Sequence, residues 1–591
     1  MITVLNIIWA IISTMTFPTF VSDKGLRFSN SIMPVLMAVG VYLALKACSK
    51  LAWDRRRWIL SHILGLLFST MTAYGYALER TGHIRFITLL IPILLYTHVF
   101  ASLITLLWQW LMKKEDEESK VFFIDRYIDS CPWLLPIGLL LAWSPALLSE
   151  FPGGFRYDAS NELIQVINGY NGNFPLLHSF IVVRLLMASK NLTGSVNAGI
   201  TIYVVVQMLL MALCYSSILL TLRKRGVRHQ VLLLVGLYTA FFPMIGLLLT
   251  QEVRDVLFAS LMTYLLFLLY LMATGGKNFW KSLRRPIELA AVLILTISAR
   301  NNNAGPLMIV GMVILVGIIL IRNIKHSRRG VAAFAVVSIA GYLLLNAALL
   351  AACQPYMAPE KSESLSMVSQ SLARTYLRHS KKWSPEELAE FNLFMDVSRM
   401  QYVGENADLS KVSMHNDANG EKMMAYWLRL GLRYPKDYAE AYLSNNADLW
   451  FPASIVDGYN KSFDIGYKKC YYDLSPELNK PAVRAHLWKG LEAYYRKMCL
   501  DISFEKIPLV SMLFSIGFQF WILIHTFFYL LYRKEKKLLL PVTILLLLTL
   551  GTSFVPLILV RYVSPPFYCN ASAPSLHFRC TKMRTRSIVD I

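Results

Sequence analysis

Charged residues are scarce in this sequence. They make up 16% of the 591 residues, whereas hydrophobic residues make up 55%, and the mean hydropathy is +0.46. A water-soluble protein of this length could hardly cover so much apolar side-chain surface with polar groups. The composition therefore excludes a soluble multidomain protein and predicts an all-α polytopic membrane protein.

Closely spaced cysteines are also lacking. The eight cysteines stand at positions 48, 131, 214, 353, 470, 499, 569 and 580. No pair has the spacing of a zinc site, so a structural metal is not expected. Cys470 and Cys499 fall in one long segment that we place outside the membrane, where an oxidising environment permits a disulfide. Two unpaired cysteines are the alternative interpretation.

Acidic residues are few beside basic ones, 37 against 59, which gives a net charge of +22. In a soluble chain this excess would suggest a nucleic-acid partner, but here the basic residues come in short clusters between apolar runs. Six alternate loops carry four Lys or Arg each, and the short loops between them carry one or two. The pattern predicts a cytoplasmic N-terminus, outward-facing sparse loops and no nucleic-acid partner.

Long apolar runs dominate what is present. About 13 of them approach the roughly 20 residues that a membrane-spanning helix needs. We expect spans at about 1–22, 31–49, 59–79, 87–112, 133–149, 197–221, 230–250, 255–275, 286–299, 304–321, 331–353, 507–532 and 538–560. The predicted organisation is an accessory bundle in 1–112, a transmembrane core in 113–353, an outer domain in 354–506, C-terminal spans in 507–566 and an atypical polar tail in 567–591.

The outer segment 354–506 is predicted to be mainly helical. Ser384-Pro385-Glu386-Glu387 has the pattern of a helix start, with an N-cap serine, a proline in the first turn and a glutamate placed to close a capping box. Strand-like alternation is weak in this segment. We therefore expect a small helical domain outside the membrane.

Ionisable residues at the ends of spans are costly, so each is a functional candidate. Under the predicted topology these residues gather on the outer face, which a single active site at one membrane surface would explain. The candidates are Asp158, Asp255, His178, Arg300, Asn301, Arg561 and Tyr562, together with Trp450 in the outer domain, whose ring could stack on a sugar.

The first long outer loop, 150–196, carries two of these candidates. Asp158 follows the turn residues Pro152-Gly153-Gly154. The apolar spacing after residue 161 and again from Phe180 to Met187 predicts two helices that lie in the membrane interface. Asp158 and His178 stand near the starts of these helices, so we expect them to approach each other above the membrane.

This set of residues suits a substrate with a lipid tail and a polar head. A carboxylate near the interface can act as a general base on a hydroxyl group. Arginines bind phosphate through a bidentate fork. Asp158 and Asp255 could also hold a divalent cation such as Mg²⁺ or Mn²⁺.

Several motifs in a fixed order carry a resemblance. They are PGGFRYDASNELIQ, NFPLLHSFIV, TQEVRDVLF, ARNNNAG, SESLSMVSQSLAR, YPKDYAEAYLSNNADLWFP and RYVSPP. Over residues 150–566 they resemble an uncharacterised family of bacterial multi-pass membrane proteins of Gram-positive type. That family is similar in architecture to the GT-C superfamily of polyprenyl-phosphate-dependent glycosyltransferases.

The resemblance implies a GT-C-like core that transfers a sugar from a lipid-linked donor to a cell-surface glycan, lipid or protein. It makes Asp158 the catalytic carboxylate, Asp255 the second acidic residue, and His178, Arg300 and Arg561 candidates for binding the donor phosphate. It also implies the bacterial plasma membrane as the location, with the active site outside. A polysaccharide polymerase or ligase and a transporter or flippase are the alternative functions.

Each candidate residue also has a purely structural interpretation. Asp158 could be a helix N-cap, and Asp255 could pair locally with Arg254. Arg300 could cap a helix C-terminus. Arg561 could extend to the membrane surface, and His178 and Trp450 could be ordinary interfacial or core residues.

Overall fold

The computed structural model is almost entirely helical, which confirms the predicted all-α class. It describes residues 2–19, 32–115, 128, 130–154, 159, 162, 165, 169–275, 277–300, 328–357, 365–415, 419–454, 487–500, 507 and 510–570. Within these ranges the only strands are β1 (Tyr170–Asn171) and β2 (Tyr356–Met357), which pair in parallel.

In the described part of the chain, five helices are long and apolar enough to cross a membrane, as expected of a membrane-embedded protein. They are α4 (Phe86–Glu115), α10 (Asn197–Lys224), α13 (Arg254–Gly275), α17 (Arg328–Ala352) and α28 (Lys536–Gly551). One bent helix pair brings the number to six, and three shorter apolar helices are α1 (Ile2–Thr16), α2 (Met33–Ser49) and α6 (Leu134–Glu150). The expected span 304–321 lies outside the described residues, and the count of thirteen stays a prediction.

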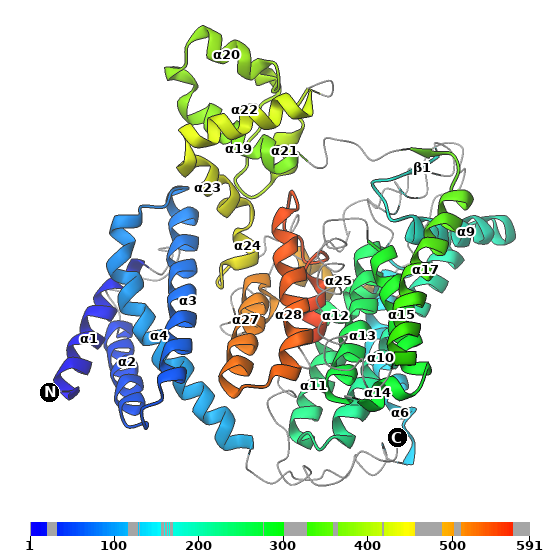
Figure 1. The fold of residues 1–591 in the computed structure, drawn as a ribbon, viewed down its shortest axis with the longest axis horizontal. Coiled ribbons are helices and arrows are strands. Elements are labelled where there is room, and N and C mark those ends of the chain that lie inside the picture. The colour runs from blue at the N-terminus through cyan, green and yellow to red at the C-terminus, as the bar shows by residue number, and fades with distance from the viewer. Residues whose placement is uncertain are drawn as a thin grey trace.

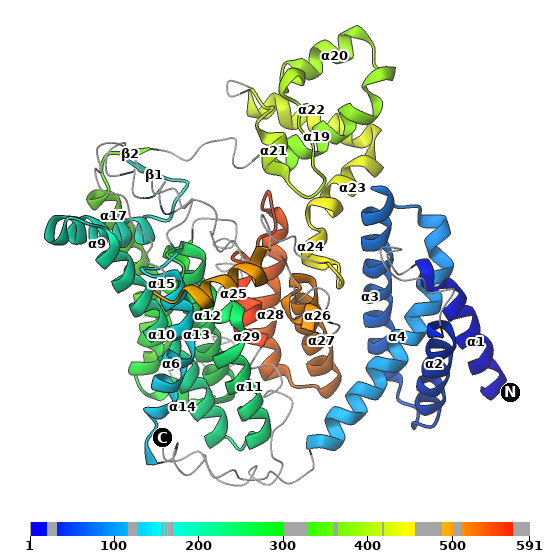
Figure 2. The same cartoon turned by 180° about the vertical axis from the view of Figure 1, so that it is seen from behind.

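The helices form two groups with a pair of C-terminal helices between them. α1, α2, α3 (Arg55–Thr81) and α4 make an N-terminal bundle (Figures 1 and 2). The larger group contains α6, α9 (Leu176–Thr193), α10, α11 (His229–Phe241), α12 (Pro243–Leu249), α13, α14 (Lys277–Lys281), α15 (Arg284–Ser298) and α17. α27 (Ile516–Arg533) lies with α28 between the groups and packs against α3. Trp108 of α4 donates from Nε1 to Nε2 of His525 on α27 at 3.0 Å, which joins the bundle to the rest of the molecule.

One span of the larger group is broken. α11 (His229–Phe241) and α12 (Pro243–Leu249) meet at an angle of 51°. Pro243 has no N–H to donate to the carbonyl of Thr239, and the indole N–H of Trp143 donates to that oxygen instead at 2.9 Å. At the other end of α12, Gln207 donates to the carbonyls of Leu249 and Gln251 at 2.9 and 3.0 Å. Side chains thus satisfy the backbone groups that the break exposes.

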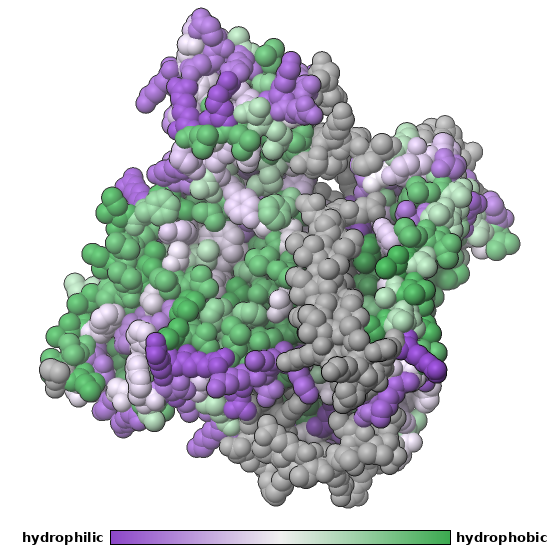
Figure 3. Space-filling view, viewed as in Figure 1, coloured by the Kyte–Doolittle hydropathy of each residue, from purple (hydrophilic) through white to green (hydrophobic). Residues whose placement is uncertain are grey.

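The surface has the layers expected of a membrane protein. α9 (Leu176–Thr193) lies across the direction of α10 and α13, as an interfacial helix would (Figure 1). A hydrophilic band marks the end of the molecule where α27 joins α28, and apolar surface separates it from the hydrophilic helices at the opposite end (Figure 3). The turn between α27 and α28 carries the basic residues Arg533, Lys534 and Lys536.

A compact helical unit stands at the end opposite the basic band. It consists of α19 (Ser366–His379), α20 (Pro385–Asn392), α21 (Ala407–Lys411), α22 (Gly420–Arg433), α23 (Pro435–Asn445) and α24 (Ala447–Trp450). It has a hydrophobic core of its own around Leu372, Phe391 and Met423. The predicted capping box is present, since Ser384 and Glu387 exchange side chain-to-backbone hydrogen bonds at 2.9 and 3.2 Å.

Glu440 of α23 fastens this unit to the turn between α3 and α4. Its carboxylate accepts from the N–H of Ile84 at 2.9 Å, from Arg374 at 2.6 Å and from Arg378 at 3.0 Å. Arg374 also donates to the carbonyl of Gly82 at 2.7 Å. Burial by itself would raise the pKa of Glu440, but the hydrogen bonds from Ile84 and Arg374 outweigh it and hold the pKa below its ordinary value.

We expect this attachment to weaken in acid. Because the pKa of Glu440 is lower in the folded protein than in the unfolded chain, its stabilising contribution is complete above the ordinary carboxyl pKa of about 4 and is lost as the pH falls through the folded value. The variant Glu440→Gln should show the same weakening at neutral pH. Hydrogen exchange of the Ile84 amide measures it, and Glu387→Gln in the capping box is the control. Equal exchange in Glu440→Gln and wild type would contradict the prediction.

Candidate functional site

The loop 150–196 begins beside the segment that leads into α13. The N–H of Gly154 donates to the carbonyl of Thr250 at 2.8 Å, and the N–H of Glu252 donates to the carbonyl of Gly154 at 2.9 Å. Gly153 has a φ of +140°, and a Cβ there would lie 2.8 Å from Val204 of α10, so only glycine fits. This pairing holds the start of the loop that contains Asp158 next to the TQEVRD motif.

Two predicted site residues, Asp158 and Asn301, lie outside the described residues. On either side of Asp158 the structure describes Gly154 and Ala159, and Ala159 is buried with 1% of its surface exposed. Asn301 directly follows Arg300, whose position is described. The predicted roles of Asp158 and Asn301 therefore stay predictions.

Three other predicted site residues come together from distant parts of the chain. Asp255 stands at the start of α13, Arg300 follows α15 (Arg284–Ser298), and Arg561 precedes α29 (Ser564–Asn570). Asp255 Oδ1 lies 3.6 Å from Arg300 Nη2, and Asp255 Oδ2 lies 3.7 Å from Arg561 Nε. All three are buried, with 1%, 4% and 9% of their surfaces exposed. We call them the Asp255 cluster.

The ion pairs of the Asp255 cluster are loose. Separations of 3.6 and 3.7 Å are longer than hydrogen bonds, and within the described part of the chain neither oxygen of Asp255 accepts one. Two guanidinium groups face one carboxylate. Aromatic rings lie against both cations: Arg300 is 5.2 Å from the ring centre of Phe258, and Arg561 is 5.0 Å from that of Tyr562. A second anion would therefore meet preorganised donors.

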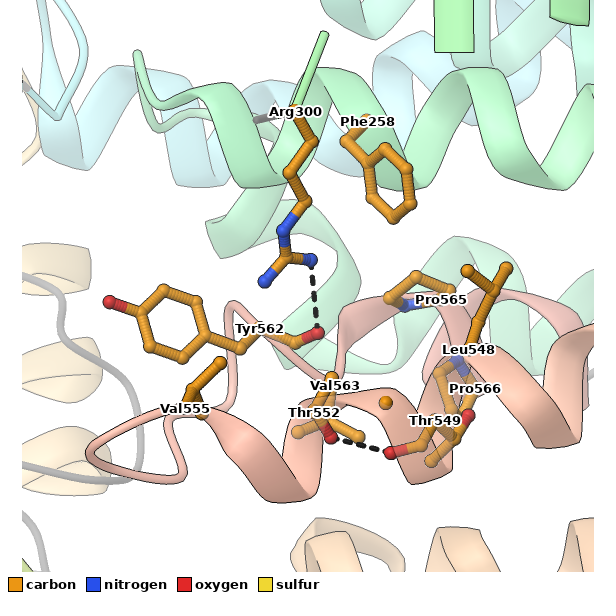
Figure 4. A pocket seen from close by; sticks show the side chains of 11 residues that line it. Phe258, Arg300, Leu548, Thr549, Thr552, Val555, Tyr562, Val563, Pro565 and Pro566 are labelled. Carbon is orange, nitrogen blue, oxygen red and sulfur yellow. Dashed lines mark hydrogen bonds between the residues drawn. The ribbon is translucent and has the colours of Figure 1, made fainter. Parts of the chain in front are cut away.

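Arg300 also lines a small, partly open pocket with a cavity volume of about 20 Å³. Its guanidinium reaches in from the end of α15 and donates to the carbonyl of Tyr562 at 3.5 Å (Figure 4). The other lining residues, mostly apolar, are Phe258, Leu548, Thr549, Gly551, Thr552, Val555, Tyr562, Val563, Pro565 and Pro566. The pocket thus has one cationic wall, while the others are largely apolar.

His178 lies in a second buried cluster. Its Nδ1 is 2.7 Å from Oε2 of Glu162, and its Nε2 is 2.9 Å from the hydroxyl of Tyr203 on α10 and 3.7 Å from Oε1 of Glu252. His178 itself has no exposed surface. We call these four residues the His178 cluster. In this structure the imidazole is bonded to protein groups, and its expected contact with the donor phosphate stays a prediction.

Glu162 and Tyr203 were not predicted as site residues. Glu162 stands four positions after Asp158, where a helical periodicity would repeat the same face, and this is the signal that could have identified it. Tyr203 sits inside the apolar run of α10, where nothing in the sequence distinguishes it. Arg254 was assigned a structural role, and it lies 4.9 Å from the ring centre of Phe174.

Trp450 does not join either cluster. It is buried where α24 packs against α27, donates from Nε1 to the carbonyl of Leu443 at 3.2 Å, and its own carbonyl accepts from Trp521 at 2.8 Å. The ring is used in packing in this conformation, and the expected sugar-stacking role stays a prediction. Cys470 and the side chain of Cys499 lie outside the described residues.

Within the described ranges, no three residues among His, Cys, Asp and Glu are arranged to hold a metal ion. The expected Mg²⁺ or Mn²⁺ site depends on Asp158 together with Asp255. Asp255 supplies carboxylate oxygens, which are the ligands these ions prefer, but an arginine lies within 3.7 Å of each oxygen and the two positive charges disfavour a cation there. The described residues supply this single carboxylate.

A family model matches residues 170–555, which is 386 of the 591 residues, and its description is "Family of unknown function (DUF6020)". The chain belongs to the DUF6020 family. The matched region of this DUF6020 protein contains His178, Asp255, Arg300 and Trp450, while Asp158 and Arg561 lie beyond its two ends. No curated protein and no solved structure matches the chain.

Removing the negative charge of Asp255 should destabilise the protein strongly. The variant Asp255→Asn leaves two buried guanidinium groups facing each other, and an uncompensated buried charge costs about 3–5 kcal/mol. The double variant Asp255→Asn/Arg561→Gln should recover part of this loss, because one of the two cations is gone. Thermal unfolding in detergent measures both effects.

The matched control is Glu288→Gln, which removes a carboxylate paired with Arg285 at 2.9 Å on α15, with 23% of its side chain exposed. Its effect on Tm should be small. If Asp255→Asn unfolds at the same temperature as this control, the Asp255 cluster does not hold the three segments together.

Proposed function

We propose that this protein is a membrane glycosyltransferase that moves a sugar from a polyprenyl-phosphate donor to an acceptor outside the membrane. The observation that supports it best is the pocket beside the Asp255 cluster, which combines a buried guanidinium with largely apolar walls. A phosphate on an apolar chain has both features. The ligand class thus follows from the pocket chemistry as well as from the motif resemblance.

The arginines have the role of binding the donor phosphate. Arg300 and Arg561 approach the same carboxylate from different segments, so their donors converge on one region. When the bond between the sugar and the phosphate breaks, negative charge grows on the phosphate oxygens. Fixed donors in a water-poor site stabilise that charge more than water does, because they need not reorganise.

Asp158 has the role of general base. It takes the proton of the acceptor hydroxyl while the hydroxyl oxygen bonds to the anomeric carbon and the polyprenyl phosphate departs. Its loop starts at Gly154, which is hydrogen-bonded to the segment that precedes Asp255. The motif resemblance implies inversion at the anomeric carbon. In this scheme Mg²⁺ or Mn²⁺ would bind at Asp158 and Asp255. Measuring transferase activity with and without EDTA tests this.

The orientation belongs to the same proposal. The basic turn between α27 and α28 lies at the end opposite α19–α24, and basic loops prefer the cytoplasmic side. We therefore place the helical unit α19–α24 and the active site outside a bacterial plasma membrane, with the N-terminus inside.

A transporter or flippase is the second candidate, and one observation favours it. The break between α11 and α12 is the kind of discontinuous helix that transporters use at their binding sites, a feature that the sequence did not reveal. In this protein, however, the side chains of Trp143 and Gln207 already hydrogen-bond to backbone carbonyls at the two ends of α12. Reconstituted protein that moves a lipid-linked sugar across liposomes without transferring it would support this candidate.

The transfer assay uses purified protein with radiolabelled polyprenyl-phosphate sugars and cell-wall acceptors. Asp158→Asn should lower kcat by about 10²–10⁴-fold, as loss of a general base does. Arg300→Lys should raise KM for the donor about tenfold, because a lysine cannot form the bidentate contact.

Arg285→Lys is the control for the arginine variant, since Arg285 pairs with Glu288 at the start of α15 and should leave both constants unchanged. Full turnover by a correctly inserted Asp158→Asn protein would remove the proposed base. An unchanged donor KM in Arg300→Lys would remove the proposed phosphate site.

A further inference from the structure

The His178 cluster is made of ionisable groups that are almost completely buried. Glu162, His178, Tyr203 and Glu252 have 1%, 0%, 7% and 0% of their surfaces exposed. They come from four separate places in the chain: the first outer loop, α9, α10 and the segment before α13. Burying two carboxylates and an imidazole is costly unless each charge is balanced by a partner. Such an arrangement needs a reason beyond packing.

The hydrogen bonds place the imidazole between two acids. A carboxylate of Glu162 accepts, so the Nδ1–H of His178 donates to it across 2.7 Å. Nε2 then carries a lone pair, and the hydroxyl of Tyr203 donates to it across 2.9 Å. Oε1 of Glu252 lies on the same side of the ring, 3.7 Å from Nε2. This separation is roughly 0.5–1 Å longer than a hydrogen bond.

The Glu162 side of the cluster is held firmly. Ser179 donates to Oε2 of Glu162 at 3.3 Å, and Gln165 donates to Ser179 at 3.5 Å. Gln165 in turn accepts from the N–H of Asn171 at 2.9 Å. Glu162 therefore has a fixed position, whereas Tyr203 and Glu252 compete for Nε2.

We propose that the His178 cluster is a proton relay between Glu252 and Glu162. The O–H bond of a protonated Glu252 breaks as an N–H bond forms at Nε2, and the Nδ1–H bond breaks as an O–H bond forms on Glu162. The proton count is unchanged: one proton leaves Glu252 and one arrives at Glu162. The hydroxyl of Tyr203 rotates from donating to Nε2 to accepting from it.

The link to catalysis rests on the proposed function. Transfer to a hydroxyl acceptor releases one proton for each sugar moved, and that proton has to leave the site. Glu252 stands three residues before Asp255, and Glu162 stands four residues after Asp158. The relay thus joins the two segments that carry the proposed catalytic carboxylates, and the same exchange run from Glu162 to Glu252 carries a proton away from the segment of Asp158.

The test measures directly which nitrogen of the His178 ring carries a proton. Protein labelled with ¹⁵N-histidine is studied by solid-state NMR in lipid bilayers, and the His178 signals are identified as those missing in His178→Gln. The relay predicts signals from both neutral forms of the ring, one with its proton on Nδ1 and one with its proton on Nε2. In Tyr203→Phe the competitor of Glu252 is gone, so the balance should shift toward the form with a proton on Nε2.

Carboxyl variants complete the test. Glu252→Gln and Glu162→Gln should each restrict His178 to a single form, and in the pH-difference infrared spectrum each should remove a protonated-carboxyl band. Glu288→Gln is the matched control, because Glu288 accepts from Tyr264 with no histidine beside it. A His178 ring that keeps one form at every pH in the wild type would overturn the relay.

The spectroscopy does not depend on transferase activity. If no polyprenyl donor is used but the ring changes form as described, the proposed function fails and the relay stands. If transfer is measured and Glu162→Gln leaves the pH profile of kcat unchanged, the relay has no part in transfer and that link is overturned.

Discussion

The compensation of buried charge at Asp255 is the interaction on which the rest of the arrangement depends. One carboxylate, 1% exposed, faces guanidinium groups from two segments that lie 261 positions apart, Arg300 and Arg561. Neither arginine could be buried without a counter-charge. The carboxylate therefore fixes where α13, the end of α15 and the chain before α29 meet, and that meeting point forms a wall of the pocket in Figure 4.

The broken span delivers Asp255 to this position. If residues 229–249 formed one straight helix, α12 would continue along the axis of α11. The 51° bend instead turns α12, and the TQEVRD motif that follows it, away from that axis. Gln207 fastens the end of α12, and Gly154 pairs with the motif itself. Polar groups at the depth of the spans thus position the charges of the site.

Much of the fold could be predicted from the sequence, because apolar runs and capping patterns are local. The capping box at Ser384 depends on four adjacent residues and is present. The grouping of Asp255 with the two arginines was expected because all three stand at the ends of predicted spans. We predicted a single span through Pro243, because membrane helices tolerate proline when other groups replace its hydrogen bond. The replacing group is the indole of Trp143, which stands 100 positions before Pro243 in the sequence.

The contacts that the sequence did not indicate have a common physical cause. Tyr203 has no distinguishing neighbours in sequence, and its importance comes from a contact with His178 across two helices. Trp450 looked like a sugar platform because aromatic pairs bind sugars, but its partner is α27, which lies some 70 residues further on. Both contacts arise from packing between distant segments, which no local sequence pattern indicates.

The central claim is that the Asp255 cluster binds the phosphate of a polyprenyl lipid. An experimental structure of the protein in nanodiscs with polyprenyl phosphate tests it most directly. The account predicts phosphate density in contact with the guanidinium groups of Arg300 and Arg561, with the prenyl chain in the pocket lined by Phe258 and Leu548. Phosphate bound at a different place, with Arg300 and Arg561 still turned only toward Asp255, would contradict it.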